Sequence, residues 1–521
     1  MTQLNPVGRQ LLAGLSEITQ RNLAFTQSTD QETINVVGAG GTLTAAYEQL
    51  RNAAENAEEH LLLQNAVRRF YKRQFSTRDE SLIARSGDEL VVELTFAGYI
   101  PNNFITTQQV AEITRIAQGY YAAYTKLLDG RIVSLDVANR WIFDTLSHGA
   151  SIIIDPRRRA DVFVALAYAH FDTLLPDYLT QRKVDAKSDY RPLLVAAIHK
   201  ALLKSDNATV RSALLDELGV TIDDIDKYVA ENRRVDAIQK SSLSDVIYHF
   251  VDRQGAPLRV LKRMIENRPD LPEIIQKREV FLEDYEQQVI REYSGVVARI
   301  NRAVMRSVVF LIITKFIVGI AIEVPYDIWA HGGIVWQPLL INLVFPPVYM
   351  IALRFTLNVP GYANTEALVS YVDAMMYGEG KVLRRRSVLD TQFSSVFSGV
   401  YAVFGFLVFG LVTWVLLNLG FSIVHIGIFF VFISAASFLG FRISRLVRDL
   451  EIVRSASNGL TFVRDLVYLP FVVVGRWMSD QYAQINIVAL VLDMLIELPL
   501  KTVLRLIRQW GAFIDDRKDR I

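Results

Sequence analysis

The stretch Ser307–Ile322, SVVFLIITKFIVGIAI, is apolar except for one charged residue, Lys315. A helix rises about 1.5 Å per residue and the hydrocarbon core of a bilayer is about 30 Å thick, so about 20 apolar residues cross it. The mixed sequence up to about Trp329 supplies the remaining length, which predicts a first membrane span at 307–323. We therefore expect an integral membrane protein.

Three more apolar segments of suitable length follow, at about 334–353, 396–417 and 423–441. The first of these contains Pro346 and Pro347, which we expect to interrupt the helix because proline has no backbone N–H. Only Asn418–Ser422 separates the last two segments, which predicts an antiparallel hairpin packed through small side chains. These small residues are Ser395, Gly399, Ala402, Gly410, Thr413, Gly427, Ser434 and Ser437.

Positive charge lies on one side of this four-span region, 291–456. Arginines precede the first span and follow the second and fourth, whereas the connections 323–333 and 418–422 contain no Lys or Arg. Lys and Arg favour the cytoplasmic side, so we expect a multi-pass protein of the cytoplasmic (inner) membrane with both termini in the cytoplasm. The first twenty residues lack the pattern of a cleaved secretory signal.

The segment 457–521 is less clearly assigned by hydropathy. Leu466–Val474 is short for a span, and Ile485–Leu500 contains Asp493 and Glu497. We interpret both as interfacial or re-entrant, with two further spans as the alternative.

After Pro499, apolar residues recur at helical spacing, while Lys501, Arg505 and Arg508 occupy other faces. Trp510 adds an aromatic anchor. This pattern predicts an amphipathic C-terminal helix lying on the anionic inner leaflet. The alternative is a helix docked on the protein's own cytosolic domain.

Residues 1–290 are more highly charged and show helical periodicity almost throughout. Short β-like runs occur at Leu90–Phe96 and Ser151–Ile154, which are too few for a sheet. Polar loops are expected at Arg78–Asp88 and Lys183–Tyr190.

Long helices are predicted at both ends of this region. Thr42–Phe75 has no proline and reads as one amphipathic helix, and Ile274–Val304 should enter the bilayer as one continuous helix. The predicted fold is thus all-α: a large cytosolic helical domain (1–290), a transmembrane bundle and an amphipathic tail.

Composition excludes several classes of function. Without cysteine there is no disulfide, thiol nucleophile or cysteine-ligated metal, and a formal net charge of +1 gives no basic surface for nucleic acid. A glycine-rich segment before Thr42 resembles a dinucleotide loop, but Leu43 stands where the third glycine belongs. Gly378–Lys381 lacks the following Ser or Thr of a phosphate loop and is interpreted as a turn.

Histidine motifs are equally weak. Asp144 and His148 are four residues apart and are interpreted as a polar pair near a helix end. His170 and Asp172 would diverge on a helix and not share a metal. We therefore expect no cofactor, no metal site and no enzymatic activity.

Lys315 is the most informative single residue, because an unpaired cation at mid-membrane is costly and should face a partner or a wet cavity. Candidate partners are Glu323, Asp493 and Glu497, and Asn342 could share a hydrogen bond. An ion or proton pathway is one hypothesis; a structural ion pair or a snorkelling lysine is the other. The candidate intramembrane polar site comprises Lys315, Asn342, Pro346, Pro347, Asp493 and Glu497.

The stretches RNAAENAEEHLLLQNAVRRFYKR (Arg51–Arg73) and GRWMSDQYAQINIVALVLDMLIELP (Gly475–Pro499) resemble segments of uncharacterised bacterial polytopic membrane proteins. The resemblance implies a bacterial cytoplasmic membrane but no activity and no site residues. Our leading hypothesis is a membrane-anchored interaction scaffold whose cytosolic domain binds protein partners, with the lipid bilayer as the other partner and homo-oligomers possible. The alternative is a transporter or channel for a small solute or ion that uses Lys315 and the proline-containing second span.

Overall fold

A computed structural model describes residues 4–27, 32–36, 45, 48, 61–155, 160–181, 190–357, 360–378, 395–453 and 459–484. Within these ranges every element is a helix, apart from an isolated bridge between Thr33 and Thr106, which confirms the all-α prediction. The chain divides into two compact units. The helical unit contains Leu4–Asp252 and Ile265–Glu273, and the membrane unit contains Arg253–Met264 and Ile274–Ile485.

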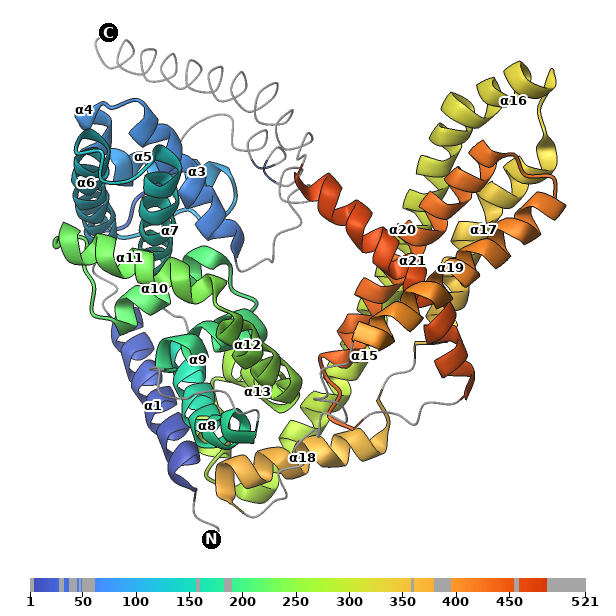
Figure 1. Cartoon of the computed structure of the whole chain (residues 1–521). Coiled ribbons are helices and arrows are strands. Elements are labelled where there is room, and N and C mark those ends of the chain that lie inside the picture. The colour runs from blue at the N-terminus through green and yellow to red at the C-terminus, as the bar shows by residue number, and fades with distance from the viewer. Residues whose placement is uncertain are drawn as a thin grey trace. The chain divides into compact units, whose positions relative to one another are not determined.

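The helical unit is an assembly of amphipathic helices (Figure 1). They are α1 (Pro6–Gln27), α3 (Leu62–Ser76), α4 (Glu80–Ile83), α5 (Ser86–Phe96), α6 (Thr107–Asp129), α7 (Leu135–Ile154), α8 (Ala160–Gln181), α9 (Arg191–Ile198), the π-helix η2 (His199–Leu203), α10 (Asn207–Glu217), α11 (Ile225–Lys240) and α12 (Ser242–Gln254). Two helices follow at the boundary between the units, α13 (Ala256–Asn267) and α14 (Leu271–Ile274).

The core of the helical unit lies around α7, which packs against α3, α6 and α10. Phe75 at the end of α3 is fully buried, and its ring contacts Tyr121, Tyr124 and Phe143 at centroid distances of 5.1 to 5.6 Å. At the start of α6 a capping box joins Thr106 and Gln109, so two backbone N–H groups of the first turn are satisfied. The core and caps together set where these helices begin and meet.

Two local expectations in this unit are wrong. Both β-like runs are helical, Leu90–Phe96 within α5 and Ser151–Ile154 at the end of α7. Leu90, Val91 and Leu94 form the buried stripe of α5, so tertiary burial outweighs the local β propensity of the run. Arg78–Asp88 is also not a simple loop, because it holds α4 and the first turn of α5. Residues 183–189 of the second predicted loop and most of Thr42–Phe75 before α3 lie outside the described residues.

The membrane unit consists of longer and more apolar helices. They are α15 (Arg278–Val318), the π-helix η3 (Gly319–Glu323), α16 (Val324–His331), α17 (Trp336–Phe355), α18 (Tyr362–Tyr377), α19 (Ser395–Asn418), α20 (Ile423–Arg448) and α21 (Gly459–Gln484). Four stretches within it are long and apolar enough to cross a membrane: Arg278–His331, Trp336–Phe355, Gly399–Asn418 and Ile423–Arg448. They coincide with the four predicted spans, and α15 confirms the continuous helix expected at Ile274–Val304 from Arg278 onward.

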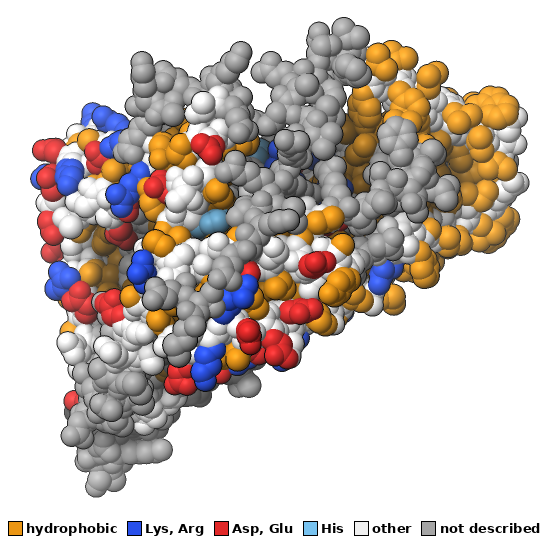
Figure 2. Space-filling model, turned by 90° about the horizontal axis from the view of Figure 1, so that it is seen from below, with side chains coloured by type: hydrophobic (Ala, Val, Ile, Leu, Met, Phe, Trp, Pro, Cys, Tyr) orange, Lys and Arg blue, Asp and Glu red, His pale blue; other side chains and the backbone are white. Residues whose placement is uncertain are grey.

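Hydrophobic side chains cover the outer surface of these helices. Figure 2 shows them gathered over the membrane helices, whereas charged side chains are spread over the remaining described surface. Phe406, Leu411 and Trp414 of α19 are each more than 60% exposed, which water would disfavour and lipid would not. The surface is thus that of a protein solvated by hydrocarbon.

Two helices in this unit are more continuous than expected. The predicted interruption of the second span is wrong, because α17 runs through both Pro346 and Pro347, which are buried. Proline keeps a helical φ and removes only its own hydrogen bond, and packing against α15 and α20 holds the helix together. Leu466–Val474 is likewise not an isolated short segment but the middle of α21, since its polar flanks are compatible with a helix.

The packing contacts also differ from the predicted hairpin. A side-chain carbon added at Gly399, Gly410 or Gly427 would meet nothing within 4 Å, so these positions do not hold α19 against α20. The close approach is instead between α20 and α21, where a carbon at Gly475 would lie 2.2 Å from the carbonyl oxygen of Ser434. Large rings fill the contact of α19 with α20, including Phe409 against Phe430 at 5.0 Å.

Candidate functional site in the membrane unit

Lys315 is enclosed by the membrane helices, with 2% of its surface exposed. Its Nζ atom lies 2.5 Å from Oε1 of Glu323, whose own exposure is 0%. The π turn η3 lies between the two residues and sets the direction of Glu323, and such turns occur frequently at functional sites. Of the predicted partners, Glu323 therefore pairs with Lys315 within the described residues, while Asp493 and Glu497 lie outside them.

Asn342 of α17 joins the same pair from a second helix. Its Nδ2 donates to Oε1 of Glu323 at 2.8 Å and to the backbone carbonyl of His425 on α20 at 3.2 Å. The ring of Phe432 lies 5.1 Å from the Lys315 ammonium and covers it with a π face. The expected hydrogen bond from Asn342 is thus present, although it reaches the carboxylate and not the lysine.

A buried carboxylate–imidazole pair includes His425, the residue whose backbone carbonyl Asn342 binds. Asp327 of α16 and His425 of α20 are both essentially unexposed, and Oδ1 of Asp327 is 3.3 Å from Nε2 of His425. Oδ2 of Asp327 accepts the backbone N–H of Val335 at 3.0 Å, and Nδ1 of His425 lies 2.9 Å from the Ser422 hydroxyl. His425 is thus buried near the end of an apolar segment, where α16 and α17 supply its neighbours.

Several atoms of this cluster have no hydrogen-bond partner within the described part of the chain. They are Oε2 of Glu323, Oδ1 of Asp327, Oδ1 of Asn342 and Nε2 of His425. Leaving a buried polar atom unpaired costs about 1–3 kcal/mol, and more for a charged group, so such atoms are rare in proteins. Other such atoms lie elsewhere in the described chain, among them Nε of Arg68 and the Tyr71 hydroxyl, but here four occur together among ionisable side chains of the membrane helices.

The proline pair lies one turn along α17 from Asn342. Residues 346 and 347 are the positions that would donate helical hydrogen bonds to the carbonyls of Asn342 and Leu343, and prolines cannot do so. The backbone carbonyls of Asn342 and Leu343 therefore lack the N–H donors that they would have in a regular helix.

The other predicted site residues are not placed. Asp493 and Glu497, and the membrane-surface residues Lys501, Arg505, Arg508 and Trp510, lie outside the described residues. Asp327 was missed as a site residue because hydropathy assigns it to the flank of the first span. The available signal was an acid, Asp327, and a histidine, His425, that stand near the ends of two apolar segments.

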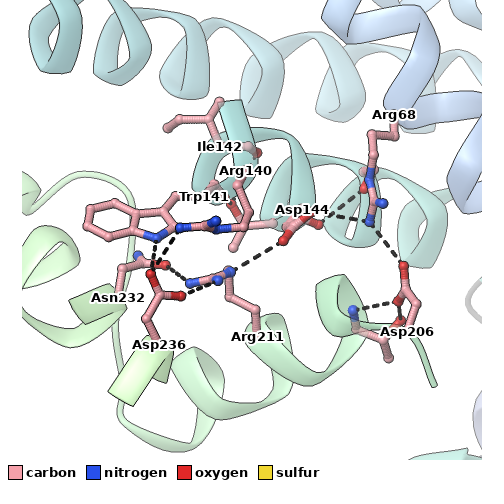
Figure 3. Close-up of polar contacts among 12 residues, drawn as sticks. Arg68, Arg140, Trp141, Ile142, Asp144, Asp206, Arg211, Asn232 and Asp236 are labelled. Carbon is pink, nitrogen blue, oxygen red and sulfur yellow. Dashed lines mark hydrogen bonds and ion pairs between the residues drawn. The ribbon is translucent and has the colours of Figure 1, made fainter. Parts of the chain in front are cut away.

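A second group of buried charges lies in the helical unit and was not predicted. Figure 3 shows Arg211 of α10 between Asp144 and Asp236. Its Nε is 3.3 Å from Asp144, Nη1 donates to Asn232 at 2.8 Å, and Nη2 is 2.5 Å from Asp236. Arg68 is shared between Asp144 and Asp206 at 3.3 and 3.0 Å.

The pKa values in this network follow from burial and the two arginines. Burial is the largest influence and raises the pKa of Asp144, against the charges of Arg68 and Arg211. Burial also acts on Asp236, but its hydrogen bond and charge interaction with Arg211 hold the pKa of that carboxyl below its usual value. The arrangement holds helices together and leaves none of the Arg211 nitrogens unpaired.

The sequence motifs with histidine take structural positions. Asp144 and His148 lie inside α7, where Asp144 binds the arginines and Nδ1 of His148 lies 3.3 Å from Oε1 of Gln64, so placing them near a helix end was wrong. Gly378 has a φ of +80° and ends α18, as expected of a turn. Within the described ranges, no three His, Asp or Glu side chains are arranged to hold a metal ion.

A scan of protein-family models and searches of curated proteins and solved structures found no match to the chain. The assignment therefore rests on the four apolar helices and the lipid-compatible surface. The chain is an all-α integral membrane protein whose membrane helices enclose a charged, incompletely hydrogen-bonded cluster.

Proposed function

We propose that the membrane unit translocates a small cation and that the buried cluster of Lys315, Glu323, Asp327, Asn342 and His425 is its binding site. The observation that carries this proposal is the set of unpaired buried oxygens where α16, α17 and α20 meet. Ionisable residues within membrane helices are expensive and are characteristic of ion and proton pathways.

The chemistry of the unpaired atoms favours a cation over an anion. Oε2 of Glu323, Oδ1 of Asp327 and Oδ1 of Asn342 are acceptors, and oxygen acceptors bind hard cations or protons. The prolines at 346 and 347 add backbone carbonyls that lack their usual helical donors. An anion would find one ammonium there, already paired with Glu323.

Flux into proteoliposomes tests this function. Purified full-length protein should support cation movement driven by a membrane potential, and Glu323→Gln should reduce the rate at least about tenfold, since one hydrogen bond to a charged group is worth about 1.5–3 kcal/mol. Gly410→Ala is the matched control, because a carbon there meets nothing and the rate should be unchanged. If the wild-type protein carries no cation in either direction, the proposal is wrong.

The interaction scaffold remains the second hypothesis. The size of the helical unit motivates it, and protein partners and homo-oligomers remain predictions that co-purification of the full chain from its own membrane would test. The cluster favours translocation, because a mere anchor has no need of buried ionisable groups.

We also propose that the protein lies in the cytoplasmic membrane and that both of its termini are in the cytoplasm. The chain has no cysteine, so single cysteines report topology directly. Labels at Ala330 and Gly420 should react from outside, and labels at Ser387 and Ser455 only after permeabilisation. External reaction at Ser387 would contradict this topology, and external reaction at Gln481 would indicate six spans.

A further inference from the structure

The geometry of Asp327 and His425 points to a specific occupant of the cluster: we infer that this pair binds a single exchangeable proton. The inference rests on the proposed function in so far as it names the translocated cation. Three observations support it: the formal charge of the cluster, the arrangement of the two side chains, and the partly exposed side chain of His331 next to Asp327.

Charge balance favours uptake of one proton. Counted formally, one lysine and two carboxylates, Lys315, Glu323 and Asp327, sum to a charge of −1. Adding one proton to the Asp327–His425 pair makes the cluster neutral. Because charge is poorly stabilised in hydrocarbon, the neutral state is favoured.

The geometry of the pair has room for this proton. Oδ1 of Asp327 and Nε2 of His425 face each other at 3.3 Å, and neither forms an aligned hydrogen bond to any described residue. The other ring nitrogen, Nδ1, already lies 2.9 Å from the Ser422 hydroxyl. When the ring takes a proton from water, both nitrogens become donors, Nδ1 to Ser422 and Nε2 to Asp327.

Within the described residues, the groups around His425 are Asp327 and the Tyr326 ring on α16, and the Phe421 ring and Ser422, which precede it in the chain. The Asn342 amide of α17 donates to its backbone carbonyl, and His331 lies against Asp327. Lys315 and Glu323 already pair with each other on the far side of Asn342. Since the Lys315 ammonium already neutralises Glu323, the carboxylate left for an added cation is that of Asp327, which the imidazole of His425 faces.

His331 provides a route to the pair. Its side chain is 43% exposed, and its Nδ1 lies 3.6 Å from the same Oδ1 of Asp327 that faces His425. It is the last residue of α16 and directly precedes the turn at Gly332. A proton therefore needs two short transfers, from water to His331 and then to the Asp327–His425 pair.

The first experiment measures proton binding directly. Full-length protein in lipid nanodiscs is titrated from pH 8 to pH 5 with a pH electrode, and wild type is compared with His425→Gln and with Asp327→Asn/His425→Gln. We expect the wild type to take up one proton per chain more than the double variant. The double variant leaves no unpaired buried charge at the two positions, so it tests the site even if the single variant does not fold. Equal uptake by folded wild-type and double-variant protein would overturn the inference.

The second experiment separates the inference from the proposed function. Proteoliposomes with a pH-sensitive dye inside are exposed to a membrane potential, and His331→Gln should slow acidification while His425→Gln abolishes it. His249→Gln, at an exposed position of α12, is the control. Flux of Na⁺ or K⁺ that is unchanged in His425→Gln would refute the proton inference and support translocation. Proton uptake without any flux would support the proton site and refute translocation.

Discussion

Arg211 of the helical unit and Lys315 of the membrane unit are buried to the same degree, with 1% and 2% of their surfaces exposed. Arg211 is bound by Asp144, Asn232 and Asp236, and none of its nitrogens is left without a partner. Within the described residues Lys315 pairs with one carboxylate, and that carboxylate keeps an unpaired oxygen. The contrast concerns the two buried cations, since Nε of Arg68 in the Arg211 network is also unpaired. A fully bonded cation fixes a structure, whereas a carboxylate oxygen left unpaired beside a cation stays able to bind.

Removing the saturated cation should have the largest effect. Arg211→Met leaves Asp144 with Arg68, and Asp236 with Arg140 and the indole N–H of Trp141. We expect a loss of about 3–5 kcal/mol in the opening free energy of α7 and α10. Hydrogen exchange of the full-length protein measures this locally. Arg115→Met, which removes an exposed pair with Glu112, is the control and should cause no measurable loss. Equal effects of both changes would remove the distinction between the units.

The membrane pair should respond less, because its partner is already incompletely bonded. Lys315→Met leaves Glu323 with the single donor Asn342, and we expect a stability loss of about 3 kcal/mol in detergent, at the low end for a broken buried pair. The double variant Lys315→Met/Glu323→Gln removes both charges and should recover much of this loss. A double variant that is less stable than the single variant would contradict a coupled pair.

Acid should distinguish the buried histidines of the two units. Burial lowers the pKa of His199 in η2 from 6.5 to about 4. The unfolded chain therefore binds this proton first, so stability is complete above pH 6.5 and declines toward pH 4, by up to about 3 kcal/mol at about 1.36 kcal/mol per pH unit.

The variant His199→Gln should lose this part of the acid sensitivity, measured by hydrogen exchange of α9 and α10 at pH 7 and pH 4.5. His249→Gln, at an exposed site, should retain it. If His199→Gln is as acid-sensitive as the wild type, a different group is responsible. In the membrane unit, by contrast, Nε2 of His425 lies 3.3 Å from a carboxylate oxygen of Asp327.

Packing between α20 and α21 should give the smallest change. Gly475→Ala places a carbon against the carbonyl of Ser434, and the resulting shift of α21 from α20 should cost about 1–3 kcal/mol in thermal unfolding. Gly410→Ala should leave stability unchanged or slightly higher. A neutral Gly475→Ala would show that α20 and α21 are not closely packed at Ser434.

Much of the membrane region was predictable because hydrocarbon imposes length and composition on each span. The predicted segments 334–353 and 396–417 end within two residues of α17 and α19. The fourth predicted segment, 423–441, is shorter than α20 because a helix continues past the hydrocarbon into its arginine-containing end. Hydropathy detects the apolar part of a helix and not its full extent.

The candidate site was predictable only in part. Lys315 was identified because a lone charge among apolar residues is conspicuous, and Glu323 and Asn342 were among its possible partners. Arg211 was missed, since an arginine on an amphipathic helix ordinarily faces water. Asp327 and His425 were missed as a pair, because nothing local relates residues 98 positions apart in the chain.

The sequence by itself determined the class of this protein: all-α, with four apolar helices and a buried lysine that required a partner. Those properties follow from the composition of each segment and from the regular spacing of its apolar residues, which can be read over tens of residues. Only the tertiary structure decided that Glu323 is that partner, that Asp327 meets His425, and that oxygens near them remain unpaired. Whether two polar side chains pair depends on a few ångströms between helices. That distance is set by side-chain packing, by the π turn and by the approach of α17 and α20, and the spacing of apolar residues along the chain does not encode it.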